Sequence, residues 1–315
     1  MASARHAPTR RAPTSETPPI DERIAWKLLH SIRPGAVEPV QVHDSSPAVW
    51  LQVYPSGAWT ASSPVTDDAR QLLDLYLPLQ RQADIVIAQA GQSLDGRIAT
   101  VSGHSHYVTG PADIRRLHRL RALVDAVVVG AATVDADNPR LTVREVDGDN
   151  PVRVVIDPND RVDRSRHVFR DRAAPTIVVR RAGGGLPSDA ADDTAGAAAR
   201  RPPAATVIEL PADPSGEISP RDVVAALRAL GHRRLLIEGG GFTVSRFIDA
   251  GAVDRLHVAV APLLIGSGHP AFTLTPIATL EQAIRPACRT FHLGEDVLFD
   301  LDLRSGTPAR RPPGM

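Results

Sequence analysis

Hydrophobic runs alternate with helical spacings along most of the chain. Short runs of Val, Ile, Leu and Ala predict buried strands, which cover residues 84–88, 125–130, 152–157, 176–180, 206–210, 234–238, 255–261 and 297–303. Two helices between them are well marked. One begins at Pro111 and carries Ile114, Leu117, Leu120 and Val124; the other has Ser219-Pro220 at its start, Val223, Val224, Leu227 and Leu230 on one face, and Gly231 at its end. The alternation predicts an α/β fold with a mostly parallel central sheet flanked by helices.

The first part of the chain follows a different pattern. Residues 21–32 and 67–76 have amphipathic helical spacing, residues 49–54 predict a strand, and residues 55–57 predict a turn. We therefore expect a small accessory subdomain over residues 20–80, which holds Trp26 and Trp50, and a main domain over residues 83–304. Residues 1–19 and 305–315 are rich in Pro, Arg and small residues and predict disordered tails. The Ala- and Gly-rich residues 182–205 predict a surface loop.

Composition narrows the classes of function. The chain has 315 residues, 43% of them hydrophobic, which is enough for a substantial core. Its 36 Lys and Arg residues match 36 Asp and Glu residues, so nucleic acid is not an expected partner. No run of apolar residues is long enough for a membrane span or a secretory signal, and a cytoplasmic location is expected. The single cysteine, Cys288, excludes an internal disulfide and a multi-cysteine zinc site within one chain.

A glycine-rich turn is the most informative motif. The strand ending at Glu238 is followed by Gly239, Gly240 and Gly241, after which Phe242 and Thr243 open a helix. Glycines let the backbone approach an anion closely, and the first turn of a helix presents unpaired N–H groups. The motif therefore predicts a phosphate cradle, with a ligand-free strand-to-helix turn as the alternative. Its spacing differs from the G-x-G-x-x-G dinucleotide fingerprint.

Polar residues gather in three further stretches, residues 93–99, 105–111 and 131–144. Each follows a strand or precedes a helix, so all three are expected at one edge of the sheet, where open α/β folds bind ligands. The candidate groups are Arg121, Arg140 and Arg144 for a phosphate, Ser105 and Thr133 for neutral hydrogen bonds, and Tyr107 for stacking on a ring. A solvated basic face with Arg115, Arg116 and Arg119 is the alternative for Arg121. No metal is expected, because His104, His106 and His118 lack a metal-ligand spacing.

Taken together, these stretches resemble the reductase domain of riboflavin biosynthesis, a dihydrofolate-reductase-like family that reduces a phosphoribosylamino-pyrimidine. The resemblance covers about residues 83–303. Its signposts are Ser93-Leu94-Asp95-Gly96, Ser105 and Tyr107 before Thr109, residues 118–122, residues 137–144, residues 237–240, and residues 253–256 leading to Ala261-Pro262.

The resemblance implies a cofactor, a substrate and a set of residues for each. NADPH, with NADH not excluded, is expected to contact Gly91, Tyr107, Thr133, Asp137, Gly239, Gly240, Gly241, Phe242 and Thr243. The phosphorylated pyrimidine is expected to meet Ser105, Arg121, Leu141, Arg144 and Glu238. Hydride would pass to an open-chain imine form of the ribosylamine, mainly through placement of the two reactants. Asp95 or Glu238 is the candidate catalytic proton donor if burial raises its pKa, and the alternative for Asp95 is a turn residue in Asp95-Gly96.

The chain also departs from the family pattern. It lacks the zinc deaminase signature of bifunctional members, so no deaminase activity is expected. Gln89 stands where many members have Lys or Asn, and Pro158 stands where Ser or Thr is frequent. Arg180 and Arg181 are alternative partners for a cofactor 2′-phosphate. The family also implies a homodimer, for which the hydrophobic residues 256–264 are a candidate interface.

Three functions are compatible with these features. The first is a stand-alone pyrimidine reductase of riboflavin biosynthesis. The second is a paralogue that reduces another nitrogen heterocycle in specialised metabolism. The third is a catalytically silent nucleotide-binding protein.

Overall fold

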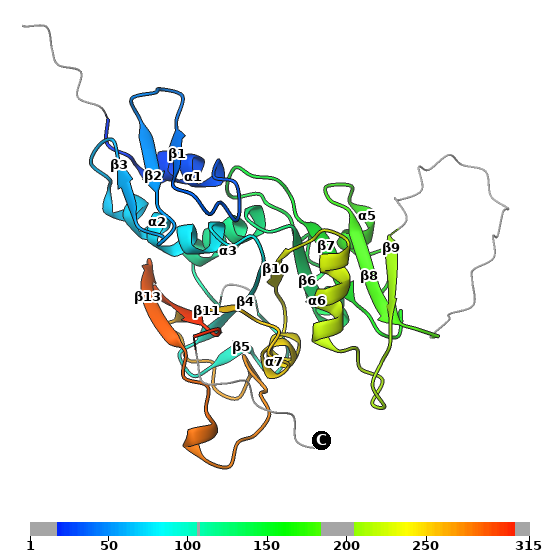
Figure 1. Cartoon of the computed structure of the whole chain (residues 1–315). Helices are drawn as coiled ribbons and strands as arrows, with labels where there is room; N and C mark the ends of the chain where they lie inside the picture. Colours follow the sequence, from blue (N-terminus) through cyan, green and yellow to red (C-terminus); the bar gives the residue numbers. More distant parts are fainter. Residues whose placement is uncertain (1–17, 106–107, 184–204, 306–315) are drawn as a thin grey trace, which may run out of the picture. The chain divides into compact units, whose positions relative to one another are not determined.

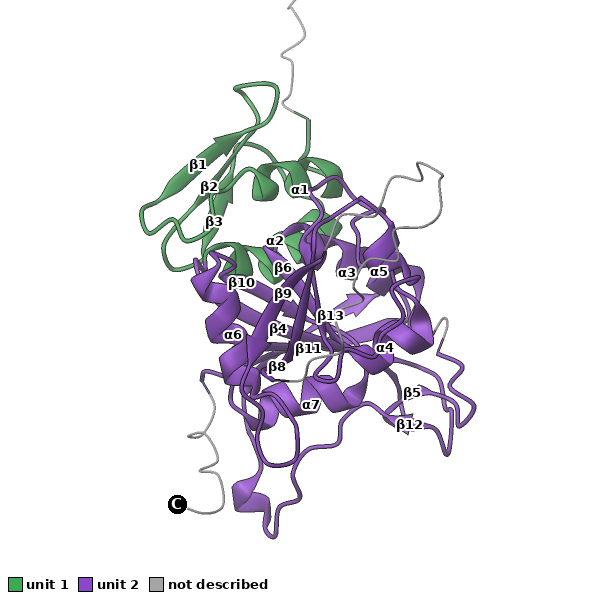
Figure 2. Ribbon diagram, turned by 90° about the vertical axis from the view of Figure 1, so that its right-hand side faces the viewer, with its two compact units in different colours: residues 1–81 green, residues 82–315 purple. Residues whose placement is uncertain are grey.

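The computed structural model describes residues 18–105, 108–183 and 205–305. The chain divides into two compact units, Met1–Arg81 and Gln82–Met315 (Figures 1 and 2). The predicted tails, except residues 18, 19 and 305, and most of the predicted loop at residues 182–205 lie outside the described residues.

The first unit contains two helices and a small antiparallel sheet. The helices are α1 (Glu22–His30) and α2 (Asp67–Gln80), and the sheet has the order β1 (Val40–His43), β2 (Trp50–Val53), β3 (Trp59–Ala61). The side chains of Asp21 and Thr66 cap the two helices by accepting hydrogen bonds from Ile24 and Ala69 N–H groups. The predicted strand is β2, whereas β1 and β3 were not predicted, since each is short and only partly buried.

The second unit is built on a nine-stranded sheet. Its order is β13 (Ala287–Leu293), β14 (Asp296–Asp302), β11 (Arg255–Ala261), β4 (Ile85–Ser93), β10 (Arg234–Ile237), β6 (Ala126–Gly130), β7 (Val152–Ile156), β8 (Thr176–Arg181), β9 (Thr206–Leu210). All neighbours from β11 to β9 are parallel, and β13 and β14 are antiparallel additions at one edge. The predicted mostly parallel α/β fold is confirmed.

The connections supply the helices. They are α3 (Pro111–Ala122), α4 (Ala131–Asp137), α5 (His167–Arg170), α6 (Pro220–Ala229), α7 (Gly241–Asp249) and the 3-10 turn η1 (Leu280–Gln282). Two short strands, β5 (Arg97–Ala99) and β12 (His269–Pro270), form a separate pair. Strands β5, β12 and β13 were missed. In β13 most positions are exposed, so no continuous apolar run marks the strand.

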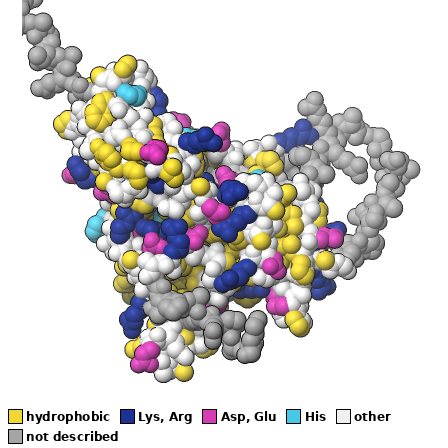
Figure 3. All heavy atoms as spheres, in the orientation of Figure 1, with side chains coloured by type: hydrophobic (Ala, Val, Ile, Leu, Met, Phe, Trp, Pro, Cys, Tyr) yellow, Lys and Arg dark blue, Asp and Glu magenta, His cyan; other side chains and the backbone are white. Residues whose placement is uncertain are grey.

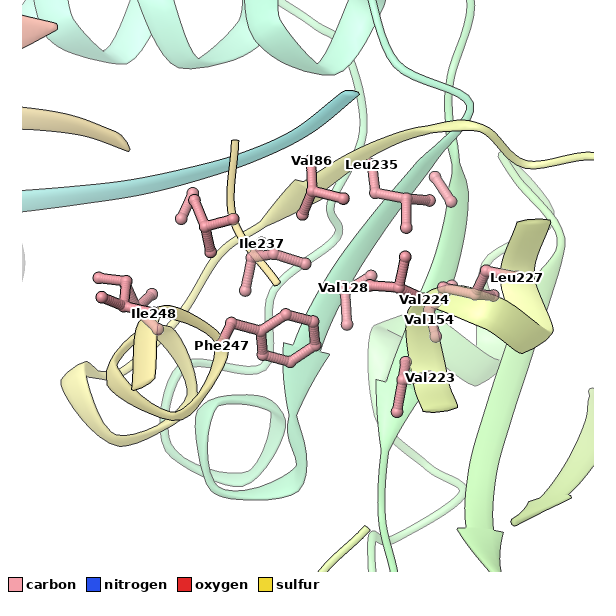
Figure 4. Close-up of a cluster of buried hydrophobic side chains, with 14 of the residues drawn as sticks. Val86, Val128, Val154, Val223, Val224, Leu227, Leu235, Ile237, Phe247 and Ile248 are labelled. Atoms are coloured by element: carbon pink, nitrogen blue, oxygen red, sulfur yellow. The ribbon is translucent and has the colours of Figure 1, made fainter. Parts of the chain in front are cut away.

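The two faces of the sheet differ in character. Val86, Val128 and Leu235 point to one face and pack with residues of α6 and α7, including Leu227 and Phe247 (Figure 4). This is the apolar core. In Figure 2, α6 lies on one side of the strands and α3, α4 and α5 on the other.

Helix α3 covers the second face with polar residues. The apolar period predicted for α3 is wrong at Ile114, which is 37% exposed. The helix instead buries Asp113, Arg116, His118, Leu120 and Arg121. The alternative of a solvated basic face is therefore wrong for Arg121, and also for Arg116, because both side chains are buried and bind Glu238 and Gln89 of the strand region beneath.

Strand β11 is not available as an edge for dimerisation. It is hydrogen-bonded to β4 on one side and to β14 on the other, so a second copy cannot pair with either edge of this strand. The candidate interface at residues 256–264 stays a prediction. The exposed leucines, Leu263 and Leu264, lie beyond its end.

The helices and the surface charge were also checked for features of membrane or nucleic-acid binding. Among the described residues, no helix combines the length and apolar character needed to cross a bilayer. On the face drawn in Figure 3, Lys and Arg side chains are interspersed with Asp and Glu.

Candidate active site

The sequence motifs converge at the carboxyl ends of the central strands. Strands β6 and β10 are parallel neighbours, so Gly130 and Glu238 leave the sheet at the same edge. The N–H of Glu238 still donates to the carbonyl of Val128, at 2.9 Å, and extends the pairing by one residue. The chain then enters α4 from β6 and α7 from β10.

Glu238 and Arg121 form a buried bidentate ion pair. Arg121 Nε and Nη2 donate to Glu238 Oε1 and Oε2 at 2.9 and 2.7 Å, and Arg121 Nη1 donates to the carbonyl of Thr142 at 3.2 Å. Both side chains are less than a tenth exposed. Burial opposes the charge on Arg121, but Glu238 outweighs it and raises the pKa of the guanidinium. All three side-chain nitrogens of Arg121 therefore donate hydrogen bonds to groups of the protein.

The loop after α4 brings further polar groups to this pair. Leu141 is buried and has a φ of 55°, a left-handed conformation that costs energy for a branched residue. Thr142 Oγ1 accepts a hydrogen bond from Arg144 Nη1 at 2.7 Å, and the backbone N–H of Arg144 donates to His118 Nδ1 at 2.9 Å. From sequence, His118 was one of the residues that carry the family resemblance and was not expected to bind a metal; the structure gives it a role in holding this loop.

The electrostatics keep His118 neutral. Burial lowers its pKa to about 4, and the charges of Arg121 and Arg144 act in the same direction. A neutral imidazole whose Nδ1 accepts a hydrogen bond carries its proton on Nε2. The pKa of Arg144 is itself lowered by burial and by Arg121 and Arg140, so several cations face one another here.

The three glycines of the cradle have different surroundings. A Cβ on Gly239 would lie 2.6 Å from Thr133 Oγ1, and Gly239 has a φ of 111°, which favours glycine. A Cβ on Gly241 would lie 2.5 Å from the carbonyl oxygen of Ala271. Only Gly240 leaves room, since the nearest atom to its Cβ would be Thr133 Oγ1 at 3.8 Å. Two of the three glycines therefore serve close packing within the protein, and one leaves open space.

Residues around the glycines complete this edge. Thr133 Oγ1 accepts a hydrogen bond from the N–H of Gly240 at 3.1 Å, which joins the start of α4 to the turn before α7. Thr243 Oγ1 lies 2.5 Å from where a Gly130 Cβ would be. Phe242 is 62% exposed, and the guanidinium of Arg246 lies 5.7 Å from its ring centroid.

The remaining predicted contact residues come from other parts of the chain. Ser105 Oγ is 3.5 Å from Asp137 Oδ1, so these two polar side chains are near neighbours. A Cβ on Gly91 would lie 3.0 Å from the side chain of Thr109 and 3.6 Å from Asp113 Oδ2. Tyr107 lies outside the described residues.

Asp95 does not meet the condition set for a proton donor. It accepts hydrogen bonds from Ser93 Oγ at 2.5 Å and from the N–H groups of Gly266 and Ile265 at 2.6 and 3.2 Å. The bonds from Ser93, Gly266 and Ile265 lower its pKa to about 2. The expectation of a raised pKa is wrong for Asp95, and the turn alternative fits its contacts.

A row of polar residues that sequence reasoning missed lies beneath α3; His257 and Asp300 in it are buried and Gln89 is partly exposed. Across neighbouring strands, Gln89 pairs in register with His257, and His257 with Asp300. Arg116 donates to Gln89 Oε1 at 3.0 Å and lies 3.1 Å from His257 Nδ1. The sequence around Gln89, His257 and Asp300 does not indicate this alignment, because their three strands lie far apart in the chain and are brought into register only by the sheet.

Among the described residues, no group of three or more His, Cys, Asp or Glu side chains is placed to hold a metal ion.

Comparison with known proteins identifies relatives over the second unit. Residues 84–298 match the family model of the RibD C-terminal domain. A 2,5-diamino-6-ribosylamino-4(3H)-pyrimidinone 5′-phosphate reductase of Methanothermobacter thermautotrophicus is 35% identical over 226 residues, which cover 70% of this chain and 98% of the relative. The riboflavin biosynthesis protein RibD of Aquifex aeolicus is 29% identical, over 74% of this chain and 62% of that protein.

Solved structures support the same fold. A deaminase/reductase of Thermotoga maritima matches with a TM-score of 0.57 and 22% identity, over 76% of this chain and 64% of its own. The riboflavin biosynthesis reductase Rib7 of Saccharomyces cerevisiae also matches with a TM-score of 0.57 and 20% identity, over 75% of this chain and 99% of its own. The chain thus spans nearly the whole of the single-function reductases and about three fifths of the two longer proteins.

Proposed function

Because the chain belongs to the RibD C-terminal domain family, we propose that it reduces a phosphoribosylamino-pyrimidine to its ribitylamino form with NADPH, a step of riboflavin biosynthesis. One observation carries the proposal. The open glycine, Gly240, follows β10 two residues after Glu238, whose carboxylate is paired with Arg121 of α3, so a cofactor and a phosphorylated substrate can meet at this strand end.

The residues of the cradle fit a dinucleotide. Within the described residues, the atom nearest to a Cβ on Gly240 would be Thr133 Oγ1 at 3.8 Å, and α7 begins there without a side-chain cap. An uncapped helix start next to an open glycine suits a pyrophosphate group. Gly240, Thr133 and Phe242 are the residues that would hold the cofactor, which supplies the hydride when bound.

We assign the substrate to the arginine-containing loop after α4 and to Glu238. Arg144 is exposed at the loop that Thr142 and His118 hold in place, and it would bind the phosphate. Ser105, whose Oγ lies 3.5 Å from Asp137 Oδ1, is the second residue that we assign to the substrate. Both oxygens of Glu238 accept from Arg121, and each keeps a further lone pair that can accept a substrate hydroxyl or N–H group. We assign Glu238 to substrate recognition and Arg121 to fixing the orientation of that carboxylate.

We propose that Arg181 binds the 2′-phosphate that distinguishes NADPH from NADH. Arg180 donates to Glu209 at 2.7 and 3.0 Å and to Asp160 at 3.3 Å, so its guanidinium is shared between two carboxylates. Arg181 is exposed at the end of β8. A cytoplasmic location and a homodimer belong to the same proposal.

Turnover tests the proposal directly. Purified protein is mixed with NADPH and either 2,5-diamino-6-ribosylamino-4(3H)-pyrimidinone 5′-phosphate or 5-amino-6-(5-phosphoribosylamino)uracil, and the loss of nicotinamide absorbance is followed. Oxidation with either pyrimidine is the expected result, and the faster one identifies the preferred substrate. No oxidation with either, but reduction of another heterocycle, would establish the paralogue. Tight NADPH binding with no turnover would establish a silent binding protein.

A further inference from the structure

The inference concerns residues 263–275, here called the strap, and it rests on the proposed function. The strap follows β11 and contains β12, which pairs with β5 and lies side by side with it in Figure 2. The carbonyl oxygens of Pro270 and Ala271 lie against Gly241, the first residue of α7, since they would be 2.6 and 2.5 Å from a Cβ there. The strap therefore packs directly on the helix start that we assign to the cofactor.

One carboxylate holds the strap where it begins. Asp95, in the turn between β4 and β5, accepts hydrogen bonds from the backbone N–H groups of Ile265 at 3.2 Å and Gly266 at 2.6 Å. Its Oδ1 also accepts from Ser93 Oγ at 2.5 Å, which fixes the carboxylate to the end of β4. Hydrogen bonds to an ionised carboxylate are stronger than those between neutral groups. Asp95 therefore joins two parts of the chain that are 170 residues apart.

Further hydrogen bonds carry the strap from this turn to α7. Arg97 Nε donates to the carbonyl of Gly266 at 3.0 Å. The N–H of Ala271 donates to the carbonyl of Gly96 at 3.0 Å, and Ala271 is 1% exposed. The residue that lies against α7 is thus bonded to the same turn that holds the start of the strap.

The other end of the strap is bonded to α7 itself. The N–H of Thr273 donates to Ser245 Oγ at 2.8 Å. The N–H and the hydroxyl of Thr275 both donate to Asp249 Oδ2 at 2.9 Å. Because the strap is bonded to the helix at one end and to the turn of Asp95 at the other, a shift of the strap also shifts the start of α7.

We propose that Asp95 is a positioning residue for the cofactor, because it holds the strap against Gly241 and so fixes the first turn of α7, where Gly240 is open to a pyrophosphate. Asp95 itself does not touch the cofactor in this arrangement. Hydrogen bonds from the N–H groups of that turn to a phosphate weaken steeply as their angles depart from linear. A looser strap therefore weakens cofactor binding and leaves the chemical step unchanged, as for an interaction made equally in the ground and transition states.

Asp95→Asn tests this role. Whichever way the amide turns, its –NH2 group faces the N–H of Gly266 or that of Ile265, so two donors meet where a carboxylate oxygen accepted. We expect the dissociation constant for NADPH, from fluorescence titration of the protein alone, to rise at least about fivefold. At saturating NADPH, the substrate KM and kcat should stay within about twofold of wild type.

Asp163→Asn is the matched control. Asp163 also accepts from a serine hydroxyl and a backbone N–H, those of Ser165 at 2.6 and 2.7 Å, but its turn lies between β7 and α5. The dissociation constant for NADPH, the substrate KM and kcat should all keep their wild-type values in this variant.

Arg97→Met loosens the strap while Asp95 stays in place. It removes the hydrogen bond to the carbonyl of Gly266, so the dissociation constant for NADPH should rise in the same direction, at least about twofold. This second variant keeps the test open if Asp95→Asn does not fold. Unchanged NADPH affinity in both folded variants would show that the strap does not position the cofactor.

Hydrogen exchange follows the strap without any ligand. The N–H of Ala271 should exchange with solvent at least about tenfold faster in Asp95→Asn than in wild type, because its bond to Gly96 opens with the strap. The same N–H should exchange at the wild-type rate in Asp163→Asn. An unchanged rate in Asp95→Asn would show that Asp95 does not hold the strap.

The outcomes distinguish this inference from the proposed function. If folded Asp95→Asn binds NADPH as wild type does, or if the substrate KM rises as much as the dissociation constant for NADPH, the positioning role is overturned and the proposed function stands. If wild type binds NADPH but reduces no pyrimidine, the proposed function falls, and the NADPH titration still decides the role of Asp95. If wild type binds no NADPH, the two fall together.

Discussion

Both carboxylate oxygens of Glu238 accept hydrogen bonds from the guanidinium of Arg121, although 117 residues separate the two in sequence. The pair joins α3 to the end of β10 and lies next to the glycine turn. A buried carboxylate and a buried guanidinium stabilise each other only while both are present.

The first prediction concerns this pair. Arg121→Met should lower the free energy of unfolding by about 3–5 kcal/mol, because it leaves the charge of Glu238 buried and unpaired. Changing both residues, Arg121→Met with Glu238→Leu, should cost less than the single change. Urea unfolding followed by circular dichroism measures both. Additive losses in the double variant would show that the two side chains do not stabilise each other.

Gly240 and Gly241 should respond differently to a side chain. Gly240 has extended backbone angles, φ −65° and ψ 156°, and open space, so Gly240→Val should fold with a melting temperature near that of wild type. It should lose NADPH affinity at least tenfold, or about 1.4 kcal/mol. Gly241→Ala should unfold at a markedly lower temperature because its Cβ meets the carbonyls of Pro270 and Ala271. Full NADPH affinity in folded Gly240→Val would show that the cofactor lies elsewhere.

Arg144 should affect the substrate and not the cofactor. Arg144→Ala removes a charged hydrogen bond, and a loss of roughly 1.5–3 kcal/mol corresponds to a rise in substrate KM of about 10- to 150-fold. The KM for NADPH should change little. Arg161→Ala, which removes an exposed arginine outside the site, is the control. Steady-state kinetics with each reactant varied in turn would contradict the assignment if both constants rose equally.

His118 should make stability depend on pH. Its pKa is about 4 in the folded protein against an ordinary 6.5, so between these values the unfolded chain binds a proton that the folded chain does not. Stability should fall as pH drops from about 6.5 to about 4, by roughly 2 kcal/mol from this residue. His118→Asn keeps an acceptor for the N–H of Arg144 but does not titrate, so its stability should fall less over this window. Parallel curves for the two proteins would refute the prediction.

Asp95 should matter for stability at low pH and not for proton transfer. Its pKa is lowered from an ordinary 3.8 to about 2, so its contribution is complete above 3.8 and is lost as pH falls toward 2. Asp95→Asn should lower the melting temperature, since an amide cannot accept all three hydrogen bonds equally well, while the shape of the kcat–pH profile stays the same. A limb of that profile that disappears in Asp95→Asn would restore Asp95 as an acid catalyst.

Several sequence predictions followed from local physics alone. The predicted strands at residues 206–210 and 255–261 coincide with β9 and β11. β11 is almost wholly buried inside the sheet, whereas β9 lies at the sheet edge and is mostly exposed, and its β-branched Val207 and Ile208 favour a strand there. Pro111 and Pro220 mark the first residues of α3 and α6, where a missing N–H costs nothing.

The errors have equally specific causes. Ile114 was assigned to the core because its spacing fits a helix, yet α3 lies over Gln89, His257 and Glu238 and buries a polar face instead. Strand β13 lies at a sheet edge and most of its residues are exposed, so no apolar run marks it in the sequence.

By itself, the sequence determined the order and type of most elements of the main sheet, and the polar residues that its loops would bring to one edge. These follow from periodicities that span only a few neighbouring residues. The tertiary structure alone decided that Arg121 pairs with Glu238, that Arg116 orients Gln89, and that Gly240 is the glycine with open space beside it. Those relationships depend on strand order and register, which bring together residues far apart in the chain and which no local pattern encodes.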